Sequence, residues 1–371
     1  MKKRIVIGLV VAIITLGWFG CSTEVELNAP YKSTTLVFGL LDPGLDTQWV
    51  KINRTWLGEG DNRIIATIKD SSEYQDGAFT GVVNEVQNGV IINSYPVFDT
   101  TLTNKEGNGI FFGPDYKAYY ILTPEELSSQ STYELELDFV DKEDVFSSTE
   151  VIELIPGTIT RPPSGLNDPT INFAQVFNDN VSFSDYGFRW TVTENAVRYE
   201  ANLVIYINEY IYEDVEQTQL IEVVPKQLNW YLGEARALLG DNEITKDVSG
   251  ETFFNFLANN LDNDPRIRRE LGTWDDANTT IRAFDFILTI GDQNLDTYLN
   301  VNSPLTGVIQ ERPEYTNVSN GLGLFSSRVS TRVNGVSYTS STMSGLRLSS
   351  LTNELNFCSP DPFSGEFYCG E

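Results

Sequence analysis

Three acidic residues at alternate positions, Glu134, Glu136 and Asp138, could form a catalytic pair of carboxyl groups. Side chains two residues apart on a strand share one face and lie about 6.5 to 7 Å from each other. Carboxyl groups at about that separation are used for glycoside hydrolysis. Apolar residues occupy the positions between them, which is also the pattern of a strand with one wet face. We predict the wet strand face and assign no catalytic residue.

The chain has no histidine, which removes a large part of catalytic and metal chemistry. Without imidazole there is no Ser-His-Asp triad, no Cys-His pair and no zinc site that needs histidine. A carboxylate enzyme is still allowed by the composition, but no pair can be chosen from the sequence. We therefore predict a binding protein that is not an enzyme.

Two cysteines near the C-terminus, Cys358 and Cys369, are the only ones after Cys21. In an exported chain they are expected to form a disulfide, since a redox pair is more usually spaced Cys-x-x-Cys. The loop between them holds three aromatic residues, which either pack on the second domain or present an apolar patch to a partner. These aromatic residues are Phe363, Phe367 and Tyr368.

Asp292, Asn294 and Asp296 have the 1, 3, 5 oxygen spacing with which an EF-hand calcium loop begins. The rest of the loop fails, because Thr297 stands at the glycine position and Ser303 at that of the bidentate glutamate. Two interpretations stay open: a structural calcium ion in one of the loops, and polar turn residues without a metal. We predict no cofactor and assign no metal ligand.

Aromatic side chains could bind a sugar or a protein partner, and they could equally fill a β-sandwich core. Within residues 199–212, three tyrosines at even positions are expected on one strand face, where their hydroxyl groups could meet solvent or a partner. These possible binding residues are Tyr206, Tyr210 and Tyr212. The tryptophans considered for a sugar platform are Trp49, Trp56, Trp190, Trp230 and Trp274.

The first 20 residues have the composition of a signal peptide. Basic residues at positions 2 to 4 precede an uncharged and mainly apolar run over residues 5–20. As a helix this run would span roughly 24 Å, short of the ~30 Å hydrocarbon core of a membrane. We therefore predict that residues 1–20 are removed.

Cys21 follows this run directly after a small residue, as in the lipobox of bacterial lipoproteins. The bulky Trp18 and Phe19 depart from the strict motif, and the looser form is similar to that of Bacteroidota lipoproteins. We predict that Cys21 carries the lipid and that residues 21–33 are the tether. A lipid of several acyl chains is then the whole membrane anchor.

The mature chain is strongly acidic, because loss of the three leader cations leaves 22 Lys and Arg against 52 Asp and Glu, a formal charge of −30. Nucleic acid and anionic lipid are poor partners for such a body. Glu24 and Glu26, just behind the lipid, are similar to the surface-export signal of Bacteroidota lipoproteins. The expected location is the outer membrane, with the body exposed at the cell surface.

The length of the mature chain suggests two domains, and the predicted fold class is mainly β. Pro and Gly residues predict a linker at 156–169. Residues 34–155 alternate apolar and polar side chains and contain an Asn88-Gly89 hairpin signal. This pattern is typical of an immunoglobulin-like or transthyretin-like sandwich.

Residues 170–371 are predicted to form a second β-rich domain with a helical insertion at about 225–271. Apolar residues recur at helical spacing at 225–239 and at 251–271, whereas the flanking segments return to strand patterning. We therefore expect two helices inserted between strands.

Three segments, residues 36–42, 53–61 and 317–325, resemble uncharacterised Bacteroidota lipoproteins of the DUF4249 family. The resemblance implies an outer-membrane lipoprotein with a β-sandwich front end, often considered alongside TonB-dependent transporters, and it implies no catalytic residue. The expected function is a non-catalytic cell-envelope lipoprotein that serves as a binding or accessory subunit of an outer-membrane protein assembly or transporter. The alternative is a surface glycan-binding lipoprotein of a polysaccharide-uptake system, which the aromatic content favours.

Overall fold

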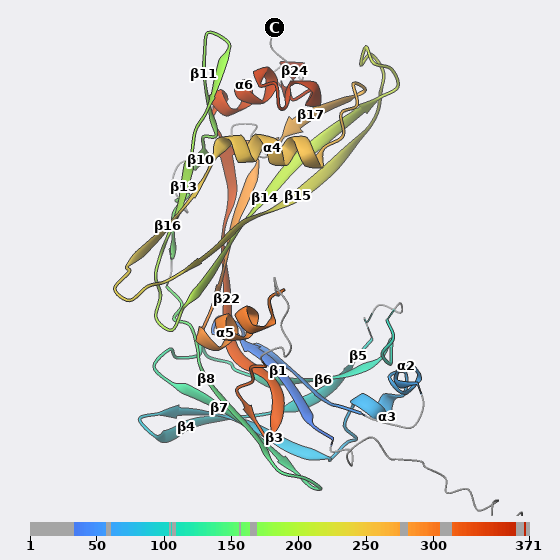
Figure 1. The fold of residues 1–371 in the computed structure, drawn as a ribbon, viewed down its shortest axis with the longest axis vertical. Helices are drawn as coiled ribbons and strands as arrows, with labels where there is room; N and C mark the ends of the chain where they lie inside the picture. Colours follow the sequence, from blue (N-terminus) through green and yellow to red (C-terminus); the bar gives the residue numbers. More distant parts are fainter. Residues whose placement is uncertain are drawn as a thin grey trace, which may run out of the picture.

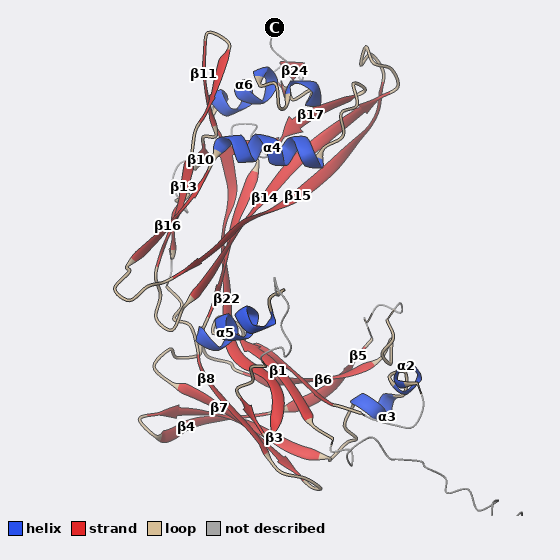
Figure 2. Ribbon diagram, viewed as in Figure 1, coloured by secondary structure: helices blue, strands red, loops and turns tan. Residues whose placement is uncertain are grey.

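One long strand, β22 (Gly321–Tyr338), runs through both halves of the molecule and is part of each (Figure 1). The structure is a computed structural model, and it describes residues 33–56, 61–103, 105, 109–155, 157–163, 169–274, 281–304, 314–360 and 367–368. The two halves lie one above the other along the long axis, and strands dominate both (Figure 2). Strands make up 51% of the described residues and helices 14%, which confirms the mainly β fold class.

The lower half in Figure 1 is a two-sheet β-sandwich. Its elements are β1 (Thr35–Leu41), β2 (Thr47–Arg54), α2 (Asn62–Ile65), α3 (Lys69–Ser72), β3 (Phe79–Gln87), β4 (Val90–Pro96), β5 (Phe98–Leu102), β6 (Tyr116–Leu122), β7 (Thr132–Phe139), β8 (Val145–Glu150) and β21 (Val318–Ser319). One sheet has the order β22-β1-β2-β6-β5 and the other β21-β8-β7-β3-β4. Alternate residues of both sheets, such as Val37 and Val83, are buried in one shared core. Asn88 and Gly89 have φ values of 53° and 74°, the positive values that a type I′ turn requires at both central residues of the predicted hairpin.

The upper half has a long sheet and a smaller one around an aromatic core. Its elements are β9 (Ile159–Arg161), β10 (Thr170–Ile171), β11 (Ala174–Phe177), β12 (Asn180–Phe183), β13 (Tyr186–Thr191), β14 (Arg198–Tyr212), β15 (Leu220–Arg236), β16 (Glu243–Val248), α4 (Gly250–Asn260), β17 (Ile267–Leu271), β18 (Thr273–Trp274), β19 (Ile281–Arg282), β20 (Phe284–Gly291), α6 (Ser340–Leu348), the 3-10 turn η1 (Asn353–Leu355), β23 (Ser359–Pro360) and β24 (Phe367–Tyr368). The long sheet has the order β15-β14-β20-β22, and the smaller one β16-β13-β9. Phe188 of β13 stacks on Phe286 of β20 with ring centroids 4.6 Å apart, which joins the two sheets.

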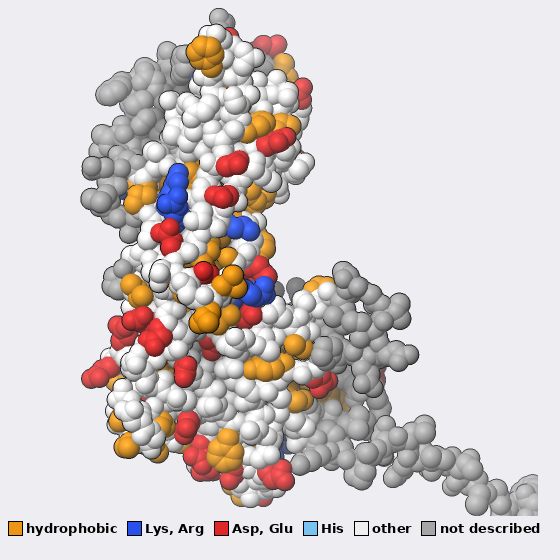
Figure 3. Space-filling model, turned by 60° about the vertical axis from the view of Figure 1, so that its left-hand side comes forward, with side chains coloured by type: hydrophobic (Ala, Val, Ile, Leu, Met, Phe, Trp, Pro, Cys, Tyr) orange, Lys and Arg blue, Asp and Glu red, His pale blue; other side chains and the backbone are white. Residues whose placement is uncertain are grey.

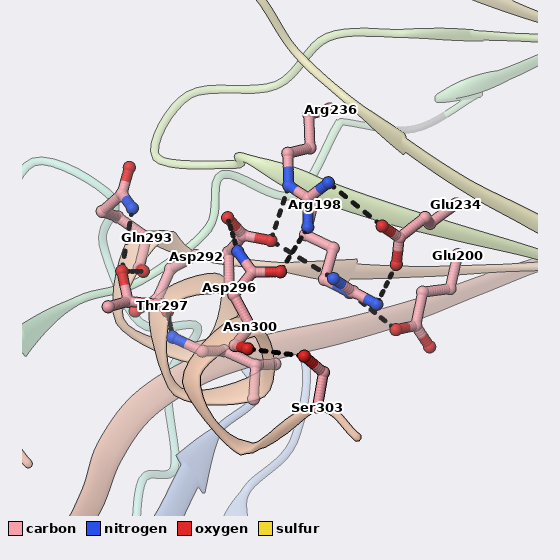
Figure 4. A network of polar contacts seen from close by, with 11 residues as sticks. Arg198, Glu200, Glu234, Arg236, Asp292, Gln293, Asp296, Thr297, Asn300 and Ser303 are labelled. Atoms are coloured by element: carbon pink, nitrogen blue, oxygen red, sulfur yellow. Dashed lines mark hydrogen bonds and ion pairs between the residues drawn. The ribbon is translucent and has the colours of Figure 1, made fainter. Parts of the chain in front are cut away.

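Helix α5 (Gln293–Asn302) lies where the two halves meet, and Figure 4 shows the polar contacts that attach it to the upper sheet. Asp296 of α5 accepts from Arg236 Nε of β15 at 2.9 Å and from Arg198 Nη1 of β14 at 3.3 Å. Glu234 pairs with both arginines, so their charges are balanced within the network. The neighbouring strands β14 and β15 are thereby bound to α5, which we call the junction helix.

Asp292 precedes α5 and joins the helix to the lower half. Its carboxylate accepts from the main-chain nitrogen of Leu295 at 2.8 Å and from Thr149 Oγ1 of β8 at 2.9 Å. It also accepts from the Ser327 nitrogen at 3.1 Å and from the Ser326 hydroxyl, both on β22. The calcium-loop interpretation of residues 292–296 is therefore wrong, because the segment begins a helix and protein donors occupy the Asp292 oxygens.

Two predicted boundaries differ from the structure. Residues 318–327 belong to the sandwich of the lower half, since β21 pairs with β8 and the first part of β22 pairs in parallel with β1. Phe325 and Val318 are buried in that core. In the predicted linker 156–169, residues 159–161 form β9, which pairs with β13. A single cut between residues 155 and 170 therefore does not separate the two halves.

The predicted helix at 225–239 is wrong, because β15 covers residues 220–236 and pairs with β14 along its whole length. Pro225 is tolerated there because β15 is an edge strand, where a missing amide donor costs least. The predicted helix at 251–271 exists over Gly250–Asn260 as α4, and residues 267–271 form β17 instead. In both segments, pairing with the long strand β14 determines the structure more strongly than the helical spacing of the apolar residues.

Among the described residues, no helix is long and apolar enough to cross a membrane. The predicted signal peptide, Cys21 and almost all of the tether, residues 1–32, lie outside the described residues.

Candidate functional site

The outer side of the sheet β1-β2-β6-β5 exposes a row of apolar and aromatic side chains. Phe98, Tyr120 and Trp49 lie on neighbouring strands, with ring centroids 5.7 Å apart for the first pair and 5.5 Å for the second. Phe98 is 43% exposed, Trp49 is 49% exposed, and Leu122, two residues after Tyr120 on β6, is 50% exposed. We call these four residues the aromatic face.

Strand alternation explains why the aromatic face points outward. On β2, Gln48, Val50 and Ile52 are buried, so Trp49 and Lys51 between them lie on the opposite side of the sheet. Neighbouring strands keep their side chains in register, with Trp49 opposite Tyr120 and Phe98 opposite Tyr120 on the other edge of β6. The inner side therefore builds the core, and the outer side displays rings that the core does not need.

A cleft of about 790 Å³ opens beside the aromatic face. Trp49 is part of its lining, and so are Trp56, Phe111 and Phe112, which come from segments outside the sheet. Trp56 and Phe111 meet edge to face with centroids 5.9 Å apart. The Phe112 amide donates to the Ala66 carbonyl at 2.9 Å, which holds this wall against the end of α2. We refer to this hollow as the cleft.

Among the described residues that line the cleft are four cations and one carboxylate: Lys51, Arg54, Lys105, Lys117 and Glu73. Lys117 forms ion pairs with two carboxylates, those of Asp76 and Asp99. Arg54 donates to the main-chain oxygen of Asp70, and Lys105 to that of Phe112, both neutral acceptors.

Three of these cations carry a charge that no described carboxylate balances. Lys51 is exposed, and neither it nor Arg54 nor Lys105 lies within 4.0 Å of a carboxylate of the residues that the structure describes. The one carboxylate of the lining, Glu73, is 4.0 Å from Lys69 Nζ, a cation outside the lining. The described lining of the cleft is therefore positive.

A second hollow of about 450 Å³ adjoins the cleft at Phe38 and Trp49, which line both. It extends to α5, where Leu295, Tyr298 and Leu299 form its far wall. Phe38 and Tyr298 meet edge to face with centroids 6.1 Å apart. No charged residue is among the described residues that line it. The positive cleft thus continues into an uncharged groove.

The predicted tyrosine stripe lies in the upper half, far along the chain from the cleft. Tyr206 and Tyr210 are half-buried on one face of β14 and donate to Asp285 at 2.9 Å and to Glu270 at 2.8 Å. Tyr212, the last residue of β14, is 7% exposed, and the Arg268 guanidinium lies 5.1 Å from the centroid of its ring. The hydroxyl groups of Tyr206 and Tyr210 are therefore used within the protein.

Glu270 of β17 is the most notable titratable group near this stripe. It is 3% exposed, and burial raises the pKa of its carboxyl group, although hydrogen bonds from Tyr210 and Asn208 act in the opposite direction. Burial and the bond to Glu270 also raise the pKa of the Tyr210 hydroxyl. Tyr210 and Asn208 both donate to the Glu270 carboxylate, so this group is used within the protein.

The other candidates from the sequence fall into the core or onto wet surface. Glu134 and Asp138 are exposed on β7, with Tyr133, Leu135 and Leu137 buried between and beside them, as a wet strand face requires. Trp190 and Trp230 are buried in the core of the upper half. The side chain of Trp274 lies outside the described residues.

The C-terminal loop is described only in part. Backbone pairing of β23 with β24 places Ser359 opposite Tyr368 and Pro360 opposite Phe367. Phe363 and Cys369 lie outside the described residues, and so do the side chains of Phe367 and Tyr368. The predicted disulfide and the predicted apolar patch of this loop stay predictions.

No group of three or more Cys, Asp or Glu residues able to hold a metal ion occurs among the described residues. The chain matches no protein-family model, and no curated protein matches it in sequence. The aromatic face and the cleft are the candidate binding surfaces among the described residues.

Sequence reasoning found part of this site. Trp49 and Trp56 were among its candidates, whereas Phe38, Phe98, Tyr120 and the cleft cations were missed. The signal available in the sequence was an apolar residue on the polar side of a strand. Trp49, which shares the outer side of β2 with Lys51, is the example. For Phe98 and Tyr120 no such signal exists in one strand alone, because the row forms only when β2, β6 and β5 pair.

Proposed function

We propose that this protein is a non-catalytic, lipid-anchored lipoprotein of the outer membrane, exposed at the cell surface, that serves as a binding or accessory subunit of an outer-membrane protein assembly or transporter. The leader at residues 1–20 and Cys21 support the anchor. The resemblance of residues 36–42, 53–61 and 317–325 to the DUF4249 lipoproteins supports a relationship to that family.

The observation that carries the binding role is the aromatic face. Phe98, Trp49 and Leu122 are each between 43% and 50% exposed on one side of a sheet. Contiguous exposed apolar surface marks interaction sites, and aromatic residues supply much of the binding energy in protein interfaces. The negative charge of the chain already keeps it in solution, and exposed aromatic rings add nothing to solubility. Contact with a partner is therefore the physical reason for these rings.

Photo-crosslinking in intact cells tests this role. A photoreactive residue at Leu122 is expected to give an adduct with an outer-membrane protein, identified by mass spectrometry. The same residue at Phe177, 78% exposed in the upper half, is the matched control and should not give that adduct. Phe98→Asp should remove the Leu122 adduct because it places a charge in the interface. Recovery of free monomer alone, or equal adducts from both positions, contradicts the proposal.

Lipidation at Cys21 and the Cys358–Cys369 disulfide belong to the same proposal. Metabolic labelling with a fatty acid analogue is expected to mark the wild-type chain and to be lost in Cys21→Ser. Pairing of β23 with β24 aligns the chain neighbours of the two C-terminal cysteines, which supports the disulfide. Alkylation without reductant should leave the mass of the chain unchanged, and two alkylated thiols would exclude the disulfide.

A glycan is the second candidate partner, and Trp49 and Trp56 in the lining of the cleft favour it. Flat tryptophan rings stack on sugar faces, and Asn53 in the same lining adds an amide. Affinity electrophoresis of residues 22–371 through gels with neutral and acidic polysaccharides is the test. Retardation that Trp56→Ala abolishes would establish the role, and free migration in every gel would exclude it.

A further inference from the structure

Cations gather in the cleft although they are scarce in the chain. There are 25 Lys and Arg against 52 Asp and Glu in total. On the face that Figure 3 shows, acidic side chains are scattered over both halves, and the few basic ones lie mainly near the narrow middle. The cleft nevertheless has four cations and one carboxylate in its lining. Three of them, Lys51, Arg54 and Lys105, have no described carboxylate within ion-pair distance.

The remaining lining is mostly apolar. Trp49, Trp56, Phe111 and Phe112 form the walls, and the uncharged groove toward α5 continues from Phe38. Sites for organic ligands are typically about 300 to 1,000 Å³ in volume and combine apolar walls with a few polar groups that fix orientation. The cleft, at about 790 Å³, has this size and this division of chemistry.

We propose that the cleft binds an amphipathic organic anion, a molecule with an apolar or aromatic body and one carboxylate, phosphate or sulfonate group. The body lies against Trp49, Trp56 and Phe111, and the anionic group faces Lys51 and Lys105. Beside aromatic walls the attraction between opposite charges is stronger than in open water. Four cations line the cleft, so a ligand with an anionic group fits it better than a neutral polyhydroxylated one.

This ligand site goes beyond the proposed function, because it needs no protein partner and is measured on the isolated chain. Residues 22–371 suffice for the test, since both cores lie within them. Failure of the crosslinking experiment and failure of ligand binding are therefore separate results.

Fluorescence of anilinonaphthalene sulfonate, an aromatic anion, provides the probe. We expect one saturable site per chain. Two arms distinguish the source of the anion: dodecanoate for fatty acids and naphthoate for aromatic acids, and displacement by either supports the proposal. Dodecyltrimethylammonium has the same chain as a fatty acid with the opposite charge and is not expected to compete. Tri-galacturonate, an acidic sugar without an apolar body, is a further competitor. The proposal is overturned by any of three outcomes: equal competition by the cation, competition by tri-galacturonate alone, or no saturable binding of the probe.

Charge reversal at Lys51 tests the position of the anionic group. Lys51 is exposed, so Lys51→Glu should fold normally and weaken probe binding about tenfold, the effect expected when a contact to a charged group is lost. Arg332→Glu is the matched control, since Arg332 is exposed on β22 in the upper half and the charge change is the same. Equal weakening by both variants would mean that only the overall charge matters, and it would refute a site.

Trp49 tests the position of the apolar body. Trp49→Ala should weaken probe binding, whereas Phe177→Ala, which removes an exposed ring far from the cleft, should leave it unchanged. Circular dichroism of each variant establishes that the fold is intact. Unchanged binding by a folded Trp49→Ala chain together with a folded Lys51→Glu chain would remove the cleft from consideration.

Discussion

Asp292 joins three elements through one carboxylate that is 5% exposed. It caps α5 at Leu295 and accepts hydrogen bonds from β8 and β22. In Asp292→Asn an amide nitrogen, itself a donor, replaces one carboxylate oxygen. At least one of the groups that donate to Asp292 then has no acceptor. We expect the free energy of unfolding to fall by about 2 to 4 kcal/mol, from loss of the cap and of buried hydrogen bonds.

Urea denaturation measures this change. Asp138→Asn is the matched control, because Asp138 is exposed on the wet face of β7, and its effect should stay within about 0.5 kcal/mol. Similar values for the two variants would show that Asp292 does not hold the junction together.

Glu270 gives a pH dependence whose sign follows from burial. Because burial raises its pKa in the folded protein, the folded chain keeps this proton to a higher pH than the unfolded chain. The contribution of Glu270 to the free energy of unfolding is therefore largest below the pKa of the unfolded chain, about 4.3. It is lost as the pH rises through the pKa of the folded protein. Glu270→Gln keeps an acceptor for Tyr210 and carries no charge, so it should be more stable than wild type at pH 8.

The gain should shrink toward zero at about pH 3, well below the unfolded pKa, where the wild-type carboxyl group is protonated in both states. Urea denaturation at both pH values measures the difference, with Glu134→Gln on the wet face of β7 as the control. A Glu270→Gln variant that is less stable than wild type at pH 8 would show that the charged form is the favoured one.

At the residue scale, sequence reasoning reached the types of these side chains but not their partners. The oxygens at 292, 294 and 296 have the spacing of a calcium loop, and the same spacing begins a capped helix. The deciding donors, Thr149 and Ser327, are 143 and 35 residues away from Asp292 in the chain. No local pattern contains that information.

At the scale of elements, β22 depends on a glycine. Gly323 has φ +121°, and a Cβ atom there would lie 1.9 Å from the Val37 carbonyl oxygen on β1. Backbone cannot give way as a flexible side chain can, so Gly323→Ala should lower the free energy of unfolding by about 3 kcal/mol or more. Thermal and urea denaturation measure the loss.

Gly89→Ala is the matched control for this substitution. Gly89 also has a positive φ, +74°, but nothing lies within 4 Å of the added atom. Only the left-handed strain remains, which costs about 1 to 2 kcal/mol. A Gly323→Ala variant no less stable than Gly89→Ala would mean that β1 and β22 separate easily.

Element types were predictable where the pattern is local. The hairpin at Asn88-Gly89 and the alternation of β7 follow from turn chemistry and a period of two, and both are present. Residues 225–239 failed because apolar residues recur there at helical spacing, while 15 residues of β14 offer them hydrogen bonds along a strand. Cross-strand pairing decides such ambiguous segments, and a single sequence does not show the partner strand.

On the scale of the whole molecule, the division into two domains was the prediction that the fold changes most. Residues 34–155 have the strands of a sandwich, but its two sheets are completed by β21 and the start of β22. These strands come from residues 318–327, which the chain reaches only after building the upper half. A chain-length estimate and a Pro- and Gly-rich segment cannot reveal a strand that returns.

The returning strand predicts that the first predicted domain does not fold alone. A fragment of residues 33–155 would leave β1 and β8 with unpaired edges and would lose Phe325, which is fully buried, and Val318 from the core. We expect this fragment to show no cooperative urea transition and little chemical shift dispersion in NMR spectra. The free-energy cost of two open strand edges and a core cavity is expected to exceed the free energy of unfolding of a small sandwich.

Adding residues 314–327 to the fragment through a Gly- and Ser-rich linker is the matched test, since it restores both strands without the upper half. This longer fragment should unfold cooperatively, because β22 can again pair with β1 and Phe325 can return to its place. If residues 33–155 alone unfold cooperatively, the lower half is an independent domain and β22 merely docks on it. If neither fragment folds, the lower half needs the junction helix as well, where Asp292 bonds to Thr149 of β8.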